Sequence, residues 1–272
     1  LVPLASGEEI GAFGLSEAGA GSDVPAVETT AERKRDEYVI DGGKLWISNG
    51  SVADTVVVFA KTDEEAGKGG ISSFIVRPEE DEGFILEGTE DKLGDKGCPT
   101  AELRFDGLCV PASRRLGEEG DGLVQSLKTL NKGRITIAAR SVGIARAALG
   151  AAFEYAHERE QFGQAVAEFQ AIQHKLADMD TKVQAAKMLT HRAADRYERG
   201  ENFVKESAQA KLYASEVSRE VANEGVQIHG GYGYVKDFPA ERFLRDAKIN
   251  EIYEGTSEVL RNTIADRMAE RR

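Results

Sequence analysis

The feature that most constrains the fold of this chain is a change of hydrophobic pattern near Pro111. Before it, short β-branched runs such as Thr55–Lys61 and Ile71–Val76 are separated by turns rich in Gly, Asp and Pro, a pattern typical of a small antiparallel barrel or sandwich. After it, apolar residues from Phe169 to Ala186 recur at spacings of three and four, which indicates amphipathic helices. Strands followed by helices predict an α+β chain with two domains.

We expect a β-barrel or sandwich domain over residues 1–112 and a C-terminal four-helix bundle over residues 113–272. Asp41-Gly42-Gly43 predicts a hairpin turn between strands, and Asp106-Gly107 predicts a second turn. The helices are expected over Leu123–Glu158, from Phe169 to Gly200, over Phe203–Ile228 and over Val259–Met268.

Composition excludes several classes of protein. The net charge of -12, from 47 acidic and 35 basic residues, argues against nucleic acid as the main partner but allows a phosphorylated ligand held by a few cations. Cys98 and Cys109 form no CxxC pair and the four histidines form no HExxH pair, so we expect no metal site and a reducing compartment. No unbroken apolar run of about 18 residues is present, so no membrane span is predicted.

Glu254 is the candidate catalytic base. It lies in the stretch Asp246–Glu258 and is followed by Gly255, Thr256 and Ser257. The two hydroxyl residues predict an N-cap, which places Glu254 in a turn outside a helix N-terminus. The helix terminus favours the ionised carboxylate and burial favours the protonated form, and the sequence leaves both outcomes open. The alternative is an ordinary acidic residue that complements the helix dipole.

Two segments of the first half are candidate ligand sites. Gly14–Asp23 (GLSEAGAGSD) exposes backbone N–H groups and hydroxyls to a polar ligand, although it carries neither GxGxxG nor GK[ST]; the alternative is a flexible turn. Lys44–Gly50 (KLWISNG) contains Trp46, the only tryptophan. This ring either packs in the core or forms a platform for a planar cofactor, with Ser48 on the same face of the strand.

Three polar segments interrupt the helical half. Asn131–Arg134 (NKGR) places a glycine inside a helix beside two cations, which is either a tolerated surface glycine or an approach point for a phosphate or acyl carrier. Glu158–Gly163 (EREQFG) is an ordinary helix–helix turn by default. Gln227–Tyr234 (QIHGGYGY) holds three glycines and two tyrosines, so the backbone there can approach a ligand closely.

Taken together and in order, these motifs resemble the acyl-CoA dehydrogenase family over essentially the whole chain. The segments that carry the resemblance are GLSEAGAGSD, KLWISNG, DKLGDKGCPTAEL, LNKGRI, EREQFG, QIHGGYGY and YEGTSE. Their joint order is specific, and Glu254 in YEGTSE is similar to the short-chain, butyryl-CoA dehydrogenase-like branch. Phe13 and Ser48 stand where many relatives have Tyr and Thr, which are mild departures.

The resemblance implies FAD-dependent α,β-dehydrogenation of an acyl-CoA thioester to a trans-2-enoyl-CoA. Glu254 would remove the α-proton while the β-hydride passes to the flavin N5, and the backbone N–H of the base and a flavin ribityl hydroxyl would hold the thioester oxygen. The alternatives are an acyl-CoA oxidase that uses oxygen, and a truncated, non-catalytic fragment that binds flavin or CoA.

By the same resemblance, site residues carry over position by position. Residues implied to bind FAD are Phe13, Leu15, Ser16, Gly21, Ser22, Trp46, Ser48, Arg159, Phe162, Gln170, Gln227, Gly230, Gly231, Thr256 and Glu258. Residues implied to contact the substrate are Ser22, Asn131, Lys132, Gly133, Arg134 and Gly255. Arg159, Phe162 and the Gln227–Gly231 loop are implied to reach the FAD of a neighbouring subunit.

The resemblance also implies partners and a location. We expect a homodimer or homotetramer, an electron-transfer flavoprotein as electron acceptor, and a cytoplasmic protein in a prokaryote or a mitochondrial-matrix protein in a eukaryote. The family has an N-terminal helical domain before its barrel, whereas this chain opens at the barrel. We therefore expect the sequence to be part of a longer protein.

Overall fold

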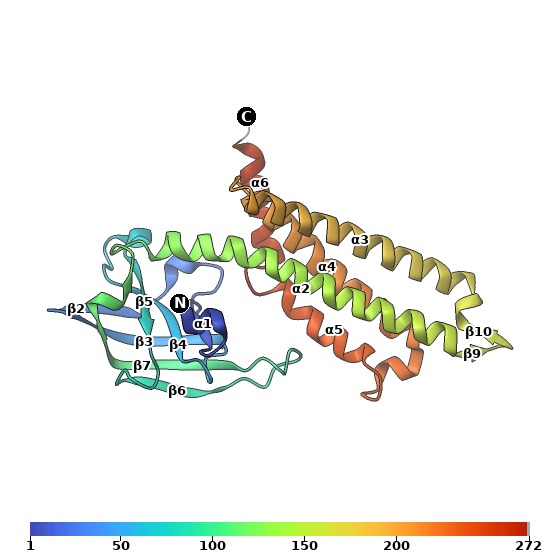
Figure 1. Cartoon of the computed structure of the whole chain (residues 1–272), viewed down its shortest axis with the longest axis horizontal. Coiled ribbons are helices and arrows are strands. Elements are labelled where there is room, and N and C mark those ends of the chain that lie inside the picture. The colour runs from blue at the N-terminus through green and yellow to red at the C-terminus, as the bar shows by residue number, and fades with distance from the viewer. Residues whose placement is uncertain (271–272) are drawn as a thin grey trace. The chain divides into compact units, whose positions relative to one another are not determined.

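The computed structural model describes residues 1–270 and divides into two compact units. The β-unit comprises Leu1–Lys92 and Lys96–Lys128, and the helical unit comprises Leu93–Asp95 and the described part of Thr129–Arg272 (Figure 1). This is the mixed α+β organisation expected from the change of pattern near Pro111.

The β-unit is built on an eight-stranded sheet with the order β6-β7-β3-β2-β4-β5-β8, and β1 pairs with β4. The strands are β1 (Gly11–Gly14), β2 (Thr30–Lys34), β3 (Glu37–Ser48), β4 (Thr55–Lys61), β5 (Ile71–Val76), β6 (Phe84–Thr89), β7 (Thr100–Pro111) and β8 (Arg115–Leu116). Short helices α1 (Val2–Ser6), η1 (Val24–Ala26), η2 (Gly67–Gly69) and η3 (Ala112–Arg114) connect them. The β1–β4 and β2–β4 pairings are parallel, so the sheet is mixed and not purely antiparallel as expected.

Both predicted Asp-Gly turns are wrong, because each lies within a long continuous strand. Asp41 and Gly42 belong to β3, and Asp106 and Gly107 belong to β7, the strand paired with it. The pairing register shifts between Ile40 and Gly42, and the Asp41 Oδ1 accepts a hydrogen bond of 2.7 Å from the backbone N–H of Gly107. The positive φ angles of the two glycines, 139° and 62°, therefore serve a β-bulge and not a chain reversal.

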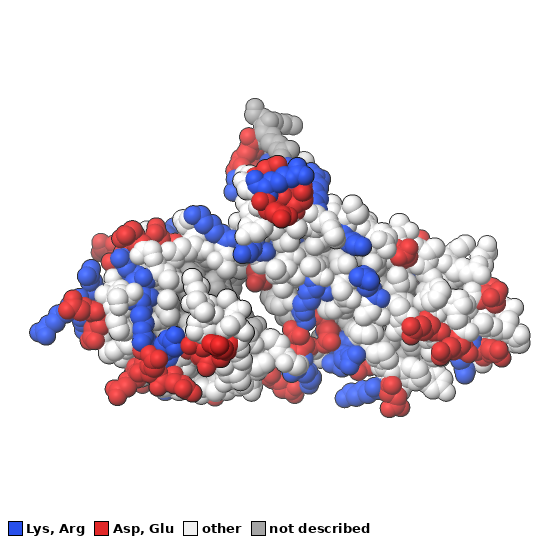
Figure 2. Space-filling model, in the orientation of Figure 1, with Lys and Arg blue, Asp and Glu red and all other residues white. Residues whose placement is uncertain are grey.

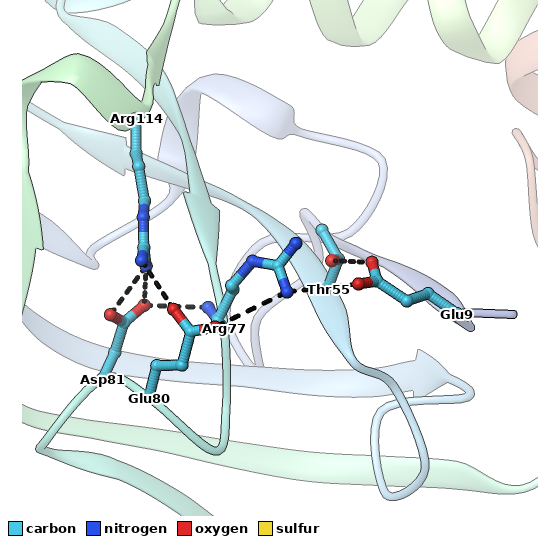
Figure 3. Close-up of polar contacts among 6 residues, drawn as sticks. All are labelled: Glu9, Thr55, Arg77, Glu80, Asp81 and Arg114. Atoms are coloured by element: carbon cyan, nitrogen blue, oxygen red, sulfur yellow. Dashed lines mark hydrogen bonds and ion pairs between the residues drawn. The ribbon is translucent and has the colours of Figure 1, made fainter. Parts of the chain in front are cut away.

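Apolar side chains from opposite strands fill the core of the β-unit. Tyr38 and Phe74 are buried and their ring centroids lie 4.8 Å apart, a tilted contact favoured between aromatic rings. A polar network also joins loops and strands of this unit (Figure 3). In it the buried Asp81 carboxylate accepts hydrogen bonds of 2.8 and 3.0 Å from Arg114 and 2.8 Å from the Arg77 backbone N–H.

The helical unit contains the predicted helices and one more. They are α2 (Gly122–Glu158, which starts in the β-unit), α3 (Gln170–Glu198), α4 (Val204–His229), α5 (Ala240–Lys248) and α6 (Ser257–Ala269). The 3-10 helices η4 (Val166–Glu168), η5 (Gly230–Tyr234) and η6 (Ile249–Glu251) and the short β9–β10 hairpin (Glu160–Gln161 and Gln164–Ala165) join them. The nine-residue α5 was not predicted, because the Asp237–Pro239 stop obscured its short apolar pattern.

Small side chains let the helices of this unit approach closely. Ala138, Ala145 and Ala152 of α2 are fully buried, in one cluster with Val183 of α3 and Val221 of α4. By length and composition α2 could also cross a membrane, but a single helix of this kind is weak evidence for a span. Core helices of soluble proteins meet the same criterion.

Candidate active site

The turn before α6 carries the candidate base. Glu254 and Gly255 lie between η6 and α6 with φ angles of +57° and +98°. The Thr256 side chain accepts a hydrogen bond of 3.3 Å from the Val259 backbone N–H, which confirms the predicted N-cap. A left-handed backbone is unfavourable for a residue with a Cβ by about 1–2 kcal/mol. The surrounding structure must therefore hold Glu254 in this conformation.

The carboxylate of Glu254 is enclosed by the helical unit. Its Oε2 atom is buried and has no hydrogen-bond partner among the described residues. An ideal Cβ at Gly133 of α2 would lie 2.5 Å from this oxygen, so a side chain at this position would displace the carboxylate. Burial raises the pKa of the Glu254 carboxyl above its usual value, while the positive charges of Arg134 and Lys211 act in the opposite direction.

Cations from α2 and α4 hold two successive carbonyl groups of this turn. The Arg134 Nε donates to the Glu254 carbonyl oxygen at 3.3 Å, and the Lys211 Nζ donates to the Gly255 carbonyl oxygen at 2.7 Å. Arg134 is 6% exposed and Lys211 is 0% exposed. Asn131 fixes the guanidinium by accepting a hydrogen bond of 2.9 Å from the Arg134 Nη1. The turn therefore has a defined backbone geometry.

A second network holds the residue before the base. Arg140 of α2 donates to the Tyr253 hydroxyl and, at 2.8 Å, to the Asn250 Oδ1. Its Nη2 lies 2.7 Å from the Asp95 carboxylate. Sequence reasoning missed these residues and Lys211. Lys211 had a detectable signal, since it interrupts the buried alanine positions of α4 at Ala208, Ala210 and Ala214.

In the β-unit, the residues expected to face a flavin lie on two adjoining segments. Trp46 is 57% exposed and has a φ of +60° next to a register shift of β3. Ser48 is also exposed and flanks the buried Ile47 on its other side. Gly21 and Ser22 are exposed in the loop after β1. An exposed indole held in an uncommon backbone conformation, beside hydroxyl and glycine positions, fits a planar ring with polar edges.

A buried ion pair joins these two segments, and sequence reasoning did not single it out. The Lys44 Nζ of β3 lies 2.6 Å from the Glu17 Oε1, and Glu17 also accepts from the backbone N–H groups of Glu28 and Thr29. Burial alone would raise the pKa of Glu17, but Lys44 and these hydrogen bonds outweigh it and lower the pKa. The pair therefore fixes the GLSEAGAGSD loop against the KLWISNG strand.

The other residues expected to bind FAD near β1 are partly or fully covered. The ring centroids of Phe13 and Phe59 lie 5.0 Å apart. Leu15 is buried and Ser16 is half-buried.

Only some of the residues expected to reach a neighbouring subunit's cofactor line a common pocket. Arg159, Gly230 and Gly231 line a pocket of about 610 Å³ in the helical unit, and the Arg159 guanidinium lies 5.6 Å from the Tyr232 ring centroid. Gln170 and Gln227 are exposed and do not line it. Phe162 is 94% exposed at the tip of the β9–β10 hairpin, where its φ of +55° and the +80° of Gly163 match a tight hairpin turn.

The remaining predicted site residues lie near the base turn or on α2. Lys132 is exposed, with its ammonium 5.3 Å from the Tyr197 ring centroid. Glu258 is exposed in the first turn of α6. Its own backbone N–H and the Thr256 hydroxyl lower its pKa.

Figure 2 shows acidic and basic side chains interspersed over the visible face, with no uniformly basic surface there for nucleic acid.

Comparison with known proteins defines the class. The family model for the acyl-CoA dehydrogenase middle domain matches residues 12–108, and the model for the acyl-CoA dehydrogenase C-terminal domain matches residues 120–269. The chain belongs to the acyl-CoA dehydrogenase family, whose members are FAD-dependent oxidoreductases.

Within this family, the similarity includes short-chain enzymes. The short-chain-specific acyl-CoA dehydrogenase of Clostridium acetobutylicum is 46% identical over 98% of this chain and 70% of its own length. Butyryl-CoA dehydrogenase from Megasphaera elsdenii superimposes with a TM-score of 0.97 at 44% identity, over 99% of this chain and 70% of that one. A chain in the structure of the electron transferring flavoprotein of Acidaminococcus fermentans has a TM-score of 0.97 at 47% identity, over 98% and 70%.

Proposed function

We propose that Glu254 is the base that removes the α-proton of an acyl-CoA thioester during FAD-dependent α,β-dehydrogenation to a trans-2-enoyl-CoA. The observation that carries the proposal is the buried Glu254 Oε2, which has no hydrogen-bond partner among the described residues and belongs to a carboxyl of raised pKa. A general base is most effective when its pKa lies near the working pH, and a carboxylate oxygen without a partner is free to accept a proton.

The residues around the base have complementary roles. Gly255 presents no side chain, so a thioester can approach the turn, and the backbone N–H of Glu254 is the proposed donor to the thioester oxygen. Arg134 and Lys211 favour the ionised base. FAD, when bound, supplies the acceptor for the β-hydride. The residues that would hold it are Phe13, Leu15, Ser16, Gly21, Ser22, Trp46 and Ser48, with Arg159, Phe162, Gln170, Gln227, Gly230, Gly231, Thr256 and Glu258.

Replacement of Glu254 by Gln tests the base. We expect FAD to stay bound while the rate of anaerobic flavin bleaching by butyryl-CoA falls by at least about 100-fold, because general base catalysis contributes about 10²–10⁴. The matched control is Asp266→Asn on the exposed surface of α6, which should bleach at the wild-type rate. Bleaching that persists in Glu254→Gln would assign the base to another residue.

We also propose an electron-transfer flavoprotein as the acceptor and a homodimer or homotetramer as the working form. The similarity to a chain of the Acidaminococcus fermentans structure supports the first. The second is supported by the exposed Phe162 at the hairpin tip, which offers an apolar contact to a second copy. Reoxidation of the reduced protein under air, with peroxide formed at the rate of substrate turnover, would support the oxidase alternative.

The finer architecture is likewise a proposal. We infer that the β-sheet closes into a small barrel over residues 1–112, carrying the flavin and substrate face. The helices of residues 113–272 would form a four-helix bundle that carries the base and the dimer contacts. The eight-stranded sheet and the buried alanine faces of α2, α3 and α4 support this division. The free thiols of Cys98 and Cys109 support a reducing location, either a prokaryotic cytoplasm or a mitochondrial matrix.

A further inference from the structure

Lys211 is a fully buried cation whose hydrogen bond to the Glu254–Gly255 turn the proposed reaction does not use. It lies on α4 among buried small residues, and its Nζ donates a 2.7 Å hydrogen bond to the Gly255 carbonyl oxygen. Burying an ammonium group is unfavourable unless it is paired and hydrogen-bonded. An apolar side chain of similar length would fill the same space without that penalty. Packing alone therefore does not account for a lysine here.

The carbonyl that Lys211 holds belongs to Gly255, the residue directly after the base. Gly255 has a φ of +98°, and a glycine peptide rotates more freely than any other. Arg134 holds the preceding carbonyl at 3.3 Å, so both peptide planes that follow the base are fixed by cations. Without the Lys211 hydrogen bond, the Gly255 carbonyl would lose the donor that fixes its orientation. The Glu254 carboxylate would then sample more directions.

We propose that Lys211 is a positioning residue for the base: its ammonium fixes the Glu254–Gly255 turn and favours the ionised carboxylate of Glu254. The inference rests on the proposed role of Glu254. Its Nζ contacts the Gly255 carbonyl oxygen, so Lys211 acts through the turn.

The charges that face Lys211 come from four neighbouring elements. Arg134 of α2 repels it, while Glu254 of the turn, Glu251 of η6 and Glu258 of α6 attract it. Burial is the strongest influence and lowers the pKa of Lys211 to about 8. Lys211 is therefore largely protonated at neutral pH, where the base must be ionised, and it loses its charge as the pH rises above about 8.

Substitutions separate the charge of Lys211 from its hydrogen bond. Lys211→Met removes both, Lys211→Gln keeps a donor without charge, and Lys211→Arg keeps both. The control is Lys205→Met, a half-buried lysine in the first turn of the same helix. Each purified holoenzyme is titrated by infrared spectroscopy, following the C=O stretch of the protonated carboxyl group that Glu254→Gln removes.

We expect the Glu254 titration midpoint to rise by about one pH unit in Lys211→Met and Lys211→Gln, because a nearby opposite charge shifts a pKa by about 1–3 units. Lys211→Arg and Lys205→Met should retain the wild-type midpoint. In the kinetics, the lower limb of the kcat profile should move with the infrared midpoint. We also expect kcat at pH 7 to fall about 10-fold in Lys211→Met, less in Lys211→Gln, and KM to change little.

An unchanged infrared midpoint in both neutral variants would overturn the proposal, as would a loss of activity that follows only the loss of thermal stability. If Lys211→Met does not fold, Lys211→Gln carries the same test. This failure is distinct from failure of the proposed function. Should Glu254→Gln still bleach the flavin, Glu254 is not the base, yet the effect of Lys211 on its titration remains measurable.

Discussion

Gly133 shows how a single missing side chain can shape a catalytic site. It lies inside helix α2, where glycine is unfavourable by about 1 kcal/mol relative to alanine. The structure gives the reason, since a Cβ would lie 2.5 Å from the Glu254 Oε2. The sequence suggested an approach point for a phosphate or acyl carrier at this glycine. In the structure, the carboxylate of Glu254 occupies the space that a side chain at Gly133 would fill.

Gly133→Ala should therefore displace the carboxylate and lower kcat/KM by on the order of 100-fold, because small misplacements of catalytic groups are costly. Gly143→Ala is the matched control on the same helix, where a Cβ would meet nothing within 4 Å. This control should keep full activity and gain about 0.5–1 kcal/mol in the free energy of unfolding. Steady-state kinetics measures the activity of the two variants, and urea unfolding measures their stability. Equal activity in the two variants would contradict the packing of Glu254 against Gly133.

At the scale of elements, a buried ion pair joins strand β3 to the loop after β1. Burial lowers the pKa of Lys44 to about 8 despite the attraction of Glu17. The unfolded chain, with an ordinary lysine, binds more protons than the folded chain between pH 8 and about 10.4. The contribution of Lys44 to stability therefore increases as the pH rises through this window.

We expect the free energy of unfolding of the wild type, relative to Lys44→Met, to increase between pH 8 and about 10.4. The comparison cancels the ionisable groups that do not contact Lys44, which leaves its partner Glu17, and urea titrations at several pH values measure it. Lys34→Met, at an exposed position of β2, should show no such trend. If the difference in the free energy of unfolding between the wild type and Lys44→Met stays constant over this pH range, folding does not lower the pKa of Lys44.

The network of Figure 3 holds another junction of the β-unit, between the turn after β5 and η3. Asp81 is buried and bonds to Arg114, whereas Glu80, which also bonds to Arg114, has a side chain that is 52% exposed. We expect Asp81→Asn to lower the free energy of unfolding by about 2 kcal/mol, since it removes the charge from a buried acceptor and hydrogen bonds to charged groups contribute about 1.5–3 kcal/mol. Glu80→Gln should cost less than about 1 kcal/mol. Similar losses in the two variants would show that burial does not govern this network.

At the scale of the whole molecule, the exposed hairpin tip is the proposed contact with a second copy of the chain. Phe162 is 94% exposed, so Phe162→Asp should not destabilise the isolated chain. If this tip contacts a second copy, light scattering should show the mass falling from a multiple of 29.5 kDa toward a single chain, with loss of bound FAD. Leu86→Asp, at an exposed position of β6 that is not a predicted contact, is the control. An unchanged mass would remove Phe162 from the assembly interface.

Predictions from the sequence were most accurate where structure is local. The three-and-four spacing of apolar residues identified α3, helices were also expected where α2, α4 and α6 lie, and the hydroxyl of Thr256 identified the cap of α6. The predictions were least accurate at Asp41-Gly42 and Asp106-Gly107. A sequence-adjacent Asp-Gly pair favours a turn, but each of these pairs lies opposite the other in neighbouring long strands. That pairing is non-local and leaves no trace in either segment.

The sequence by itself determined the class of the chain, because motifs in a fixed order and at fixed separations resemble one family. It also placed Glu254 in a turn beside a helix terminus. Only the tertiary structure decided what surrounds that carboxylate. Gly133 of α2 leaves space for it, and the cations Arg134 and Lys211 hold the Glu254–Gly255 turn. These residues are 43 to 121 positions away along the chain. The electrostatics of a buried group depends on distance in space and on burial, and neither is encoded by the residues next to it.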